Sequence, residues 1–172
     1  MNISSGYGFG LWLVPQCPYL KENINHIPHI TLICNLSLSS ATNLYHSIEE
    51  HFRYNIPSFT MNITGENTQA TIFPIGEYSS NSNYLTQHSW GYYCDTDDHQ
   101  LRLTNQLIRD FSIDNHFIGS IPSKPHLTVQ YSNHIDSLSL YQCPSDIMSP
   151  ITCTMKLVDI TSGDSSNWTL LN

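Results

Sequence analysis

Two matching hexapeptides decide the fold expected for this chain: IPHITL at residues 27–32 and KPHLTV at residues 124–129. Each places a proline before a His-x-Thr triplet that is followed by an apolar residue, in a run typical of a strand. Because side chains alternate between the two faces of a strand, the histidine and threonine of each motif point one way and the apolar residues point toward the core. If the two strands are neighbours, they form a pocket with two imidazoles and two hydroxyls, which suits a phosphoryl group. The four polar side chains are His29, Thr31, His126 and Thr128.

The repetition of this motif exceeds what chance produces. In a chain of this composition, roughly 8% of histidines would be followed by the pattern x-Ser/Thr-apolar, so one match among nine histidines carries no information. Requiring a proline before the histidine lowers the frequency to roughly 0.4%, and two such matches become roughly a one-in-a-thousand event. The pair therefore indicates a functional site, whereas a single match would be read as an ordinary histidine at a strand edge.

The rest of the chain alternates strand and helix signals. Strands are predicted where β-branched and aromatic residues cluster, and helices where apolar residues recur every three or four positions after a Ser, Thr or Asp cap. A helix is predicted from Ser39 or Ser40 to Arg53, a second from the acidic start at 95–98 through Phe111, and a surface loop at 76–88. The predicted strands cover residues 8–14, 29–34, 59–64, 70–75, 90–94, 126–131, 151–160 and 168–171. This order predicts an α+β domain with two similar lobes.

Length and charge narrow the possible functions. A chain of 172 residues predicts one domain over residues 1–172, because two domains would each have a very small core. Only 12% of the residues are charged, and 14 acidic against 6 basic side chains leave a formal net charge of −8. The basic residues are scattered singly, so no basic track for a long nucleic acid is present in the sequence. We therefore expect a small ligand, and a protein that is a monomer.

Neither a membrane span nor a metal site is predicted. The most apolar stretch, residues 11–14, is ended by Pro15 and is far shorter than the ~20 residues that a spanning helix needs. No Lys or Arg precedes Lys21 and no clear small-residue cleavage site is present, which argues against a secretory signal. The five cysteines are widely spaced without a CxxC pair, which indicates reduced thiols. A cytoplasmic protein that needs no metal or other cofactor is expected.

The two motifs resemble those of the 2H phosphoesterase superfamily, whose members include LigT-like proteins and eukaryotic cyclic phosphodiesterases. The chain is most similar to the plant and yeast-type cyclic phosphodiesterases. This similarity covers the opening strand at 10–15, both Pro-His motifs, Tyr131 after the second motif and a final hairpin that carries Trp168. The resemblance implies a bilobal LigT-like fold, in which two pseudo-symmetric antiparallel-sheet lobes with flanking helices surround a central cleft.

The resemblance also implies hydrolysis of a cyclic phosphodiester without a metal ion. One of His29 and His126 would remove a proton from the attacking water, and the other would protonate the departing ribose oxygen, in an order that the sequence leaves open. Thr31 and Thr128 would donate hydrogen bonds to the non-bridging phosphate oxygens. The implied substrates are 2′,3′-cyclic nucleotide phosphates or ADP-ribose 1″,2″-cyclic phosphate, each opened to a phosphomonoester.

Five further residues are candidates for binding the rest of the substrate. By the resemblance, the aromatic side chains of Trp12, Tyr131 and Trp168 lie near the cleft, where each could stack on a nucleobase or pack in the core. Lys124 and Gln130 flank the second motif and could contact phosphate or ribose.

Two clusters look like metal ligands but are better explained otherwise. His26 lies three residues before His29 without a second pair or an acidic ligand nearby in the sequence, and it is read as a solvated or rim histidine. The run CDTDDH at 94–99 contains three aspartates, which are typical of a helix N-terminus because they accept hydrogen bonds from its N–H groups.

Two other functions stay open from the sequence. The same four motif residues could act on a cyclic dinucleotide or a 2′-5′-linked oligoadenylate and so degrade an immune messenger. Outside catalysis, the chain could be a module that only binds nucleotides or a protein partner, although binding alone would not need two imidazoles. Turnover by histidine variants separates these possibilities.

Overall fold

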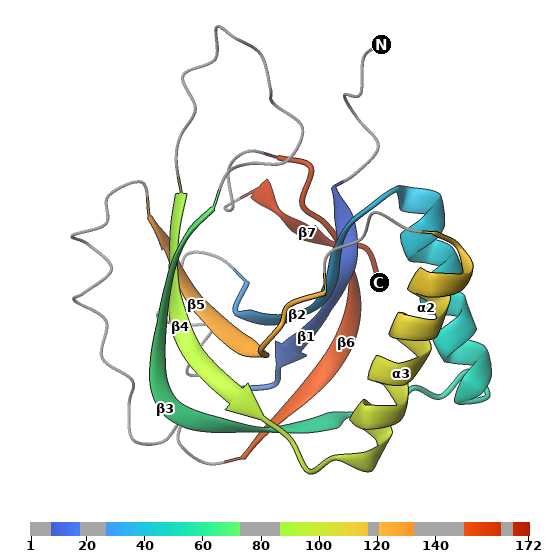
Figure 1. Cartoon of the computed structure of the whole chain (residues 1–172), viewed down its shortest axis with the longest axis horizontal. Helices are drawn as coiled ribbons and strands as arrows, with labels where there is room; N and C mark the ends of the chain where they lie inside the picture. The colour runs from blue at the N-terminus through green and yellow to red at the C-terminus, as the bar shows by residue number, and fades with distance from the viewer. Residues whose placement is uncertain (1–7, 18–26, 73–86, 117–120, 133–149, 163–166) are drawn as a thin grey trace, which may run out of the picture.

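The computed structural model describes residues 8–17, 27–72, 87–116, 121–132, 150–162 and 167–172, and these form a mixed α+β fold (Figure 1). The predicted class is confirmed, and both His-x-Thr motifs begin strands. The elements along these residues are β1 (Phe9–Pro15), β2 (His29–Leu36), α2 (Leu38–His51), β3 (Phe59–Ile72), β4 (Gln87–Asp95), α3 (His99–Asp114), β5 (His126–Ser132), β6 (Ile151–Asp159) and β7 (Thr169–Leu170). None of the helices described is long and apolar enough to cross a membrane.

The described strands belong to one antiparallel sheet in the order β1-β2-β5-β4-β3-β6-β7. The whole of β1 also pairs with residues 153–159 of β6, so the sheet closes on itself (Figure 1). β3 contributes to the closure because its start, Phe59–Met61, pairs with β6 and the remainder pairs with β4. This arrangement makes β2 and β5 neighbours, although they are far apart in the sequence.

Both helices lie on the same side of the sheet (Figure 1). α2 follows Ser37, whose hydroxyl accepts a hydrogen bond from the Ser40 N–H at 3.1 Å. α3 follows Asp98, whose carboxylate accepts from the N–H groups of two residues in the first turn. The helices bury one stripe each, at the three- and four-residue spacings of an amphipathic helix. These buried residues are Ala41, Leu44 and Ile48 in α2, and Leu101, Thr104 and Ile108 in α3.

Alternation along the strands sorts the side chains onto two faces. The face toward the helices, called the helix side below, forms the main core, which includes Leu11, Leu13, Ile30, Leu32, Leu127 and Val129. The opposite face carries a smaller cluster of Trp12, Val14, Val158 and Ile160. Ile30 and Leu127 separate the histidine from the threonine in the two motifs, and both lie in the main core. The polar motif residues therefore fall on the opposite face, called the motif face below.

Three predicted boundaries were wrong. The strands predicted at 59–64 and 70–75 are one strand, β3, whose pairing with β4 shifts in register between Ile63 and Asn67. Such a shift admits extra residues into one strand without ending it. The loop predicted at 76–88 ends earlier, because residues 87 and 88 belong to β4. The last strand covers 169–170 rather than 168–171. Residues 73–86 lie outside the described residues.

Candidate active site

The two His-x-Thr motifs lie side by side on antiparallel neighbouring strands. The Cα of His29 pairs with that of Thr128, and Ile30 pairs with Leu127. Continued by one residue, this register sets Thr31 level with His126. Opposite residues of an antiparallel pair have Cβ atoms ~4.5–5.5 Å apart and share a face, while diagonal neighbours are ~7–8 Å apart. Each histidine therefore lies opposite the threonine of the other motif, and the two histidines are diagonal neighbours on the same face of the sheet.

Each histidine is held by the same local hydrogen bond. Nδ1 of His29 lies 2.7 Å from the carbonyl oxygen of Ile27, and Nδ1 of His126 lies 3.2 Å from the carbonyl oxygen of Lys124. Because a carbonyl oxygen can only accept, Nδ1 must carry the proton in both rings. Nε2 is then the atom that gains or loses a proton on each ring, as an acid or base on a shared substrate requires.

The surroundings of the two histidines differ. His29 is 2% exposed, and its ring stacks on Trp12 with centroids 3.5 Å apart and planes inclined by 5°. His126 is only half-buried. Its register partner on β4 is Tyr93, whose ring lies 3.9 Å from the Nζ of Lys124. The imidazole of His29 is thus held at Nδ1 by a hydrogen bond and on one face by Trp12, whereas that of His126 lies at a more open position.

The two motif threonines are also placed unequally. Thr128 is 4% exposed and pairs with Gly91 of β4, so no side chain stands opposite it on that strand. Thr31 is half-buried and pairs with Trp12 of β1. Both hydroxyls are on the motif face, where they can donate to an anion held between the histidines.

The side chain of Trp12 is packed against other side chains of the protein. It is 2% exposed, with its ring against His29 and the edge of Trp168 at a centroid distance of 5.7 Å. Of the two alternatives left open for Trp12, stacking on a nucleobase or packing in the core, the structure shows packing, because other side chains cover the ring. Its position instead orients the imidazole of His29.

Trp168 lies at the margin of the motif face. Its indole N–H donates to the Ser162 carbonyl oxygen at 2.8 Å, and its ring centroid lies 6.3 Å from that of His29. The ring is half-buried, so part of it is accessible from solvent. The backbones of Gln130 and Tyr131 belong to β5, where they pair with Trp90 and Ser89, but their side chains are outside the described residues.

Sequence analysis did not single out Tyr93 or Gly91. Both lie on β4 opposite motif residues, and a Cβ at Gly91 would overlap the carbonyl oxygen of Leu127. Glycine is therefore required for the close approach of β4 to β5. The strand at 90–94 was predicted, but its partner and register were not, and those decide which of its residues reach the site.

Of the two clusters that look like metal ligands, the structure describes only the run at 94–99, which begins α3. Asp98 caps α3, as predicted, and also accepts a hydrogen bond from the Thr60 N–H at 2.7 Å. Across the described ranges, no three or more His, Cys, Asp or Glu side chains gather closely enough to hold a metal ion. His26 lies outside the described residues.

Comparison of the chain with protein-family models, with curated proteins and with solved structures finds no match.

Proposed function

We propose that this protein is a cyclic phosphodiesterase with the two-lobed arrangement of the 2H phosphoesterases, and that it hydrolyses a small nucleotide-type cyclic phosphate without a metal ion. The observation that carries the proposal is the reciprocal register of the motifs, in which His29 pairs with Thr128 on the neighbouring strand. A pseudo-twofold axis between the strands relates one His-Thr pair to the other. Two equivalent acid–base groups on opposite sides of a phosphorus atom are what an in-line displacement needs.

Hydrolysis then proceeds by one proton transfer at each imidazole. The neutral ring accepts a proton from water at Nε2 as the water oxygen bonds to phosphorus. The protonated ring donates its Nε2 proton to the ribose oxygen as the bond between that oxygen and phosphorus breaks. The hydroxyls of Thr31 and Thr128 donate to the non-bridging oxygens, where negative charge grows in the transition state. The product is a phosphomonoester with a free ribose hydroxyl, and each histidine has exchanged its protonation state.

The surroundings favour a compact substrate. The ammonium group of Lys124 lies over the ring of Tyr93, the register partner of His126, where it can attract a phosphate, while the chain as a whole carries a net charge of −8. Trp168 offers a partly exposed ring at the margin of the motif face, where a nucleobase could stack. These features fit 2′,3′-cyclic nucleotides or ADP-ribose 1″,2″-cyclic phosphate.

Turnover of a substrate panel tests the proposal. The panel contains 2′,3′-cyclic mononucleotides, ADP-ribose 1″,2″-cyclic phosphate, a cyclic dinucleotide and a 2′-5′ oligoadenylate, each incubated in excess EDTA. We expect hydrolysis of the small cyclic phosphates, and a loss of kcat of about 10²- to 10⁴-fold in both His29→Ala and His126→Ala, since each removes one proton-transfer group. The double variant should be little slower than either single variant, because the two groups act in one step.

His46→Ala is the matched control, because His46 is an exposed histidine of α2 whose ring contacts Glu49 and Tyr45. It should keep full activity. Turnover that survives in both motif variants would reject the two-histidine mechanism, and loss of all activity in EDTA would reject metal independence. Cleavage of only the dinucleotide or oligoadenylate would identify a messenger-degrading enzyme. Ligand binding with no turnover of any substrate would identify a binding module.

A further inference from the structure

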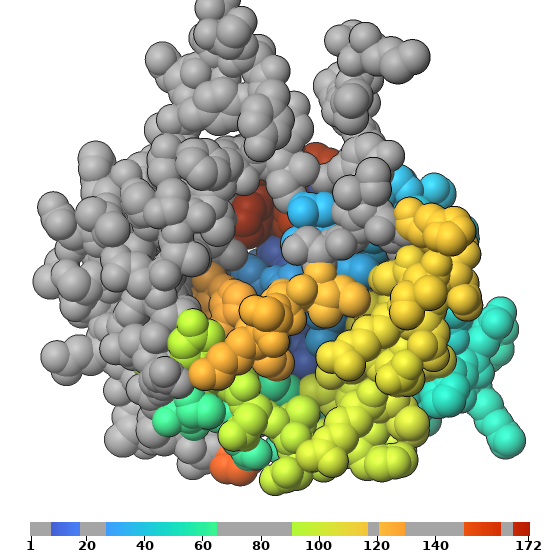
Figure 2. Space-filling model, in the orientation of Figure 1, coloured from blue at the N-terminus to red at the C-terminus, as the bar shows by residue number. Residues whose placement is uncertain are grey.

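A pocket lies on the helix side, beneath α3, with a cavity volume of about 90 Å³. In Figure 2 it corresponds to the opening between α3, in yellow, and the segment at 121–125, in orange, with blue atoms of β1 and β2 at its base. Neither histidine of the motifs lines it, and of the four motif residues only Thr31 borders it. The pocket is therefore separate from the motif face, although it shares the strand β2 with that face.

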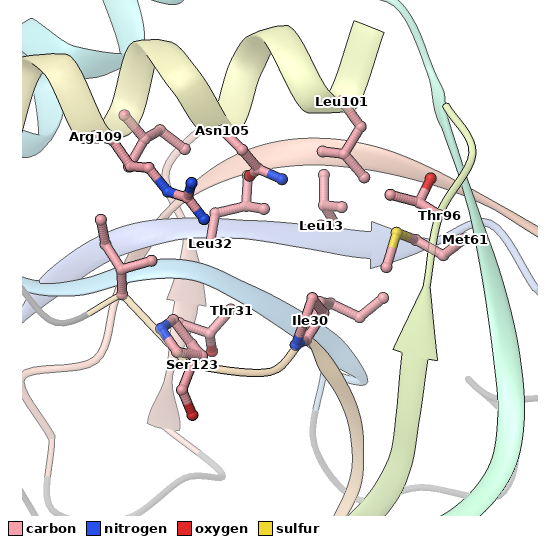
Figure 3. Close-up of a pocket in the computed structure, with 14 residues that line it drawn as sticks. Leu13, Ile30, Thr31, Leu32, Met61, Thr96, Leu101, Asn105, Arg109 and Ser123 are labelled. Carbon is pink, nitrogen blue, oxygen red and sulfur yellow. The ribbon is translucent and has the colours of Figure 1, made fainter. Parts of the chain in front are cut away.

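Three layers of the fold enclose this pocket (Figure 3). α3 contributes Leu101, Asn105 and Arg109, which recur every four residues and so lie on one side of the helix. The sheet contributes the apolar side chains of Leu13 and Leu32, both part of the main core. The segment at 121–125 forms the third wall and leads directly into His126.

The charge of the pocket is unbalanced. Arg109 is the single charged residue in its lining. It is exposed and so lies at the open side of the pocket, and the described part of the chain offers it no hydrogen bond or ion pair. The other arginine of α3 differs, since Arg102 lies 3.5 Å from the Asp97 carboxylate and donates to the Thr96 carbonyl oxygen at 3.3 Å. In a protein with a net charge of −8, a cation without an acidic neighbour in its pocket marks a position that can accept an anion.

The polar groups of the pocket define what that anion is. A guanidinium presents paired N–H donors that match the two oxygens of a carboxylate. Asn105 of α3 and Ser123 of the third wall add donors within the same lining, while leucine and isoleucine side chains form the floor. A cavity of about 90 Å³ exceeds the space of a single water, which needs ~10–15 Å³ on a comparable measure. The cavity is therefore large enough for a short aliphatic chain.

We propose that the pocket beneath α3 binds a small aliphatic carboxylate, with the carboxylate on Arg109 and the apolar chain against Leu13 and Leu32. This proposal does not depend on catalysis at the motif face. Because two of its walls, β2 and the segment at 121–125, carry the two His-x-Thr motifs, the bound ligand also contacts the backbone that positions His29 and His126.

Titration with hexanoate, followed by calorimetry and by backbone amide NMR of the full chain, tests the proposal. We expect saturable binding, with shifts concentrated in residues 30–32, 101–109 and 121–125. Arg109→Gln should weaken binding about tenfold or more, because a charge-assisted hydrogen bond is lost. Arg102→Gln is the matched control on the same helix and should bind as the wild type does. Hexan-1-ol, which lacks the charge, should bind at least tenfold more weakly than hexanoate.

Several results would overturn the assignment: no saturable binding of hexanoate, equal binding by Arg109→Gln and wild type, or equal binding of hexanol and hexanoate. Inorganic phosphate, which the proposed function places at the motif face, should not displace hexanoate, and displacement would mean that there is one site rather than two. A preparation that binds hexanoate but hydrolyses nothing in the substrate panel would reject the proposed function while leaving this site in place.

Discussion

Each motif histidine is oriented by its own backbone, through a hydrogen bond from Nδ1 to the carbonyl oxygen two residues earlier. The proline that precedes each histidine lies between that carbonyl and the ring, at positions 28 and 125. Proline fixes its own φ near −65° and restricts the residue before it to extended conformations, so the carbonyl is held where the ring can reach it. The Pro-His pair thus sets the imidazole tautomer through a hydrogen bond within the same short segment.

Trp12 is predicted to act as a positioning residue for His29. Trp12→Leu should lower kcat by between tenfold and a hundredfold with little change in KM, because the imidazole loses the surface that fixes its plane. Trp12→Phe retains an aromatic face and should recover most of the activity. Steady-state kinetics on a 2′,3′-cyclic nucleotide measure both effects.

A spectroscopic readout separates positioning from general destabilisation. The ring current of Trp12 should move the ring protons of His29 upfield in the wild type, and Trp12→Leu should abolish that displacement while the ring signals of His126 stay in place. An unchanged kcat in Trp12→Leu would show that the stack has no part in turnover.

At the scale of elements, short contacts decide how the helices and strands meet. Asp98 both caps α3 and accepts from the Thr60 N–H of β3, so one carboxylate begins the helix and attaches it to the sheet. Gly91 allows β4 to approach β5 more closely than any other residue would. The Asp98 contacts position α3, which covers the pocket. The close approach at Gly91 positions β5, the strand that carries His126.

Asp98→Ala should lower the free energy of unfolding by ~1–2 kcal/mol, since it removes a helix cap together with the hydrogen bond to Thr60. Asp97→Ala is the matched control, because the Asp97 side chain is 96% exposed and its contact with Arg102 is a surface ion pair. That change should cost less than ~0.5 kcal/mol. Urea unfolding of the three proteins measures the differences, and equal losses in the two variants would contradict the special role of Asp98.

Gly91→Ala should force β4 and β5 apart and so disturb the motif face. The expected cost is ~1–3 kcal/mol of stability, from overlap with the Leu127 carbonyl, together with a loss of turnover. Gly8→Ala is the control: a Cβ there meets Thr161 instead, away from β5. Both variants should melt earlier, but only Gly91→Ala should shift the amide signals of His126 and Thr128. Normal turnover in a folded Gly91→Ala protein would contradict this account.

At the scale of the whole molecule, one core on the helix side joins strands from both ends of the chain. Cys94 of β4 and Cys153 of β6 are both buried in it. Burial disfavours the thiolate and raises the pKa of each thiol from its ordinary 9.0 to about 12. Both groups are therefore neutral in the folded protein at physiological pH and behave as small apolar side chains.

These thiols predict a loss of stability in alkali. A group whose pKa is higher in the folded state stabilises the fold fully below its unfolded pKa of about 9, and the contribution is lost as the pH rises toward 12. Each thiol contributes a slope of up to ~1.4 kcal/mol per pH unit in that window. Urea unfolding at pH 8, 9, 10 and 11 should show a steeper decline in the wild type than in the Cys94→Ala/Cys153→Ala variant. Parallel curves would show that the thiols do not contribute.

Much of the secondary structure was predictable because its signals are local. The alternation of polar and apolar residues indicated β2 and β5, the recurrence of apolar residues indicated α2 and α3, and the aspartates before α3 indicated its cap. The continuity of β3 was missed, since the register shift that lets the strand continue depends on its pairing with β4, which the sequence of β3 does not reveal.

The sequence by itself determined which residues could form a site, because the repeated Pro-His-x-Thr motif sets each side chain's face and each imidazole's tautomer through local geometry. Only the tertiary structure decided that the motifs are neighbours, that His29 pairs with Thr128, and that Trp12 packs on His29 instead of remaining open to a ligand. It also decided that Arg109 lines a pocket beneath α3. These outcomes depend on strand order and register, which are set by packing between segments far apart in the chain. They therefore cannot be predicted from any single segment.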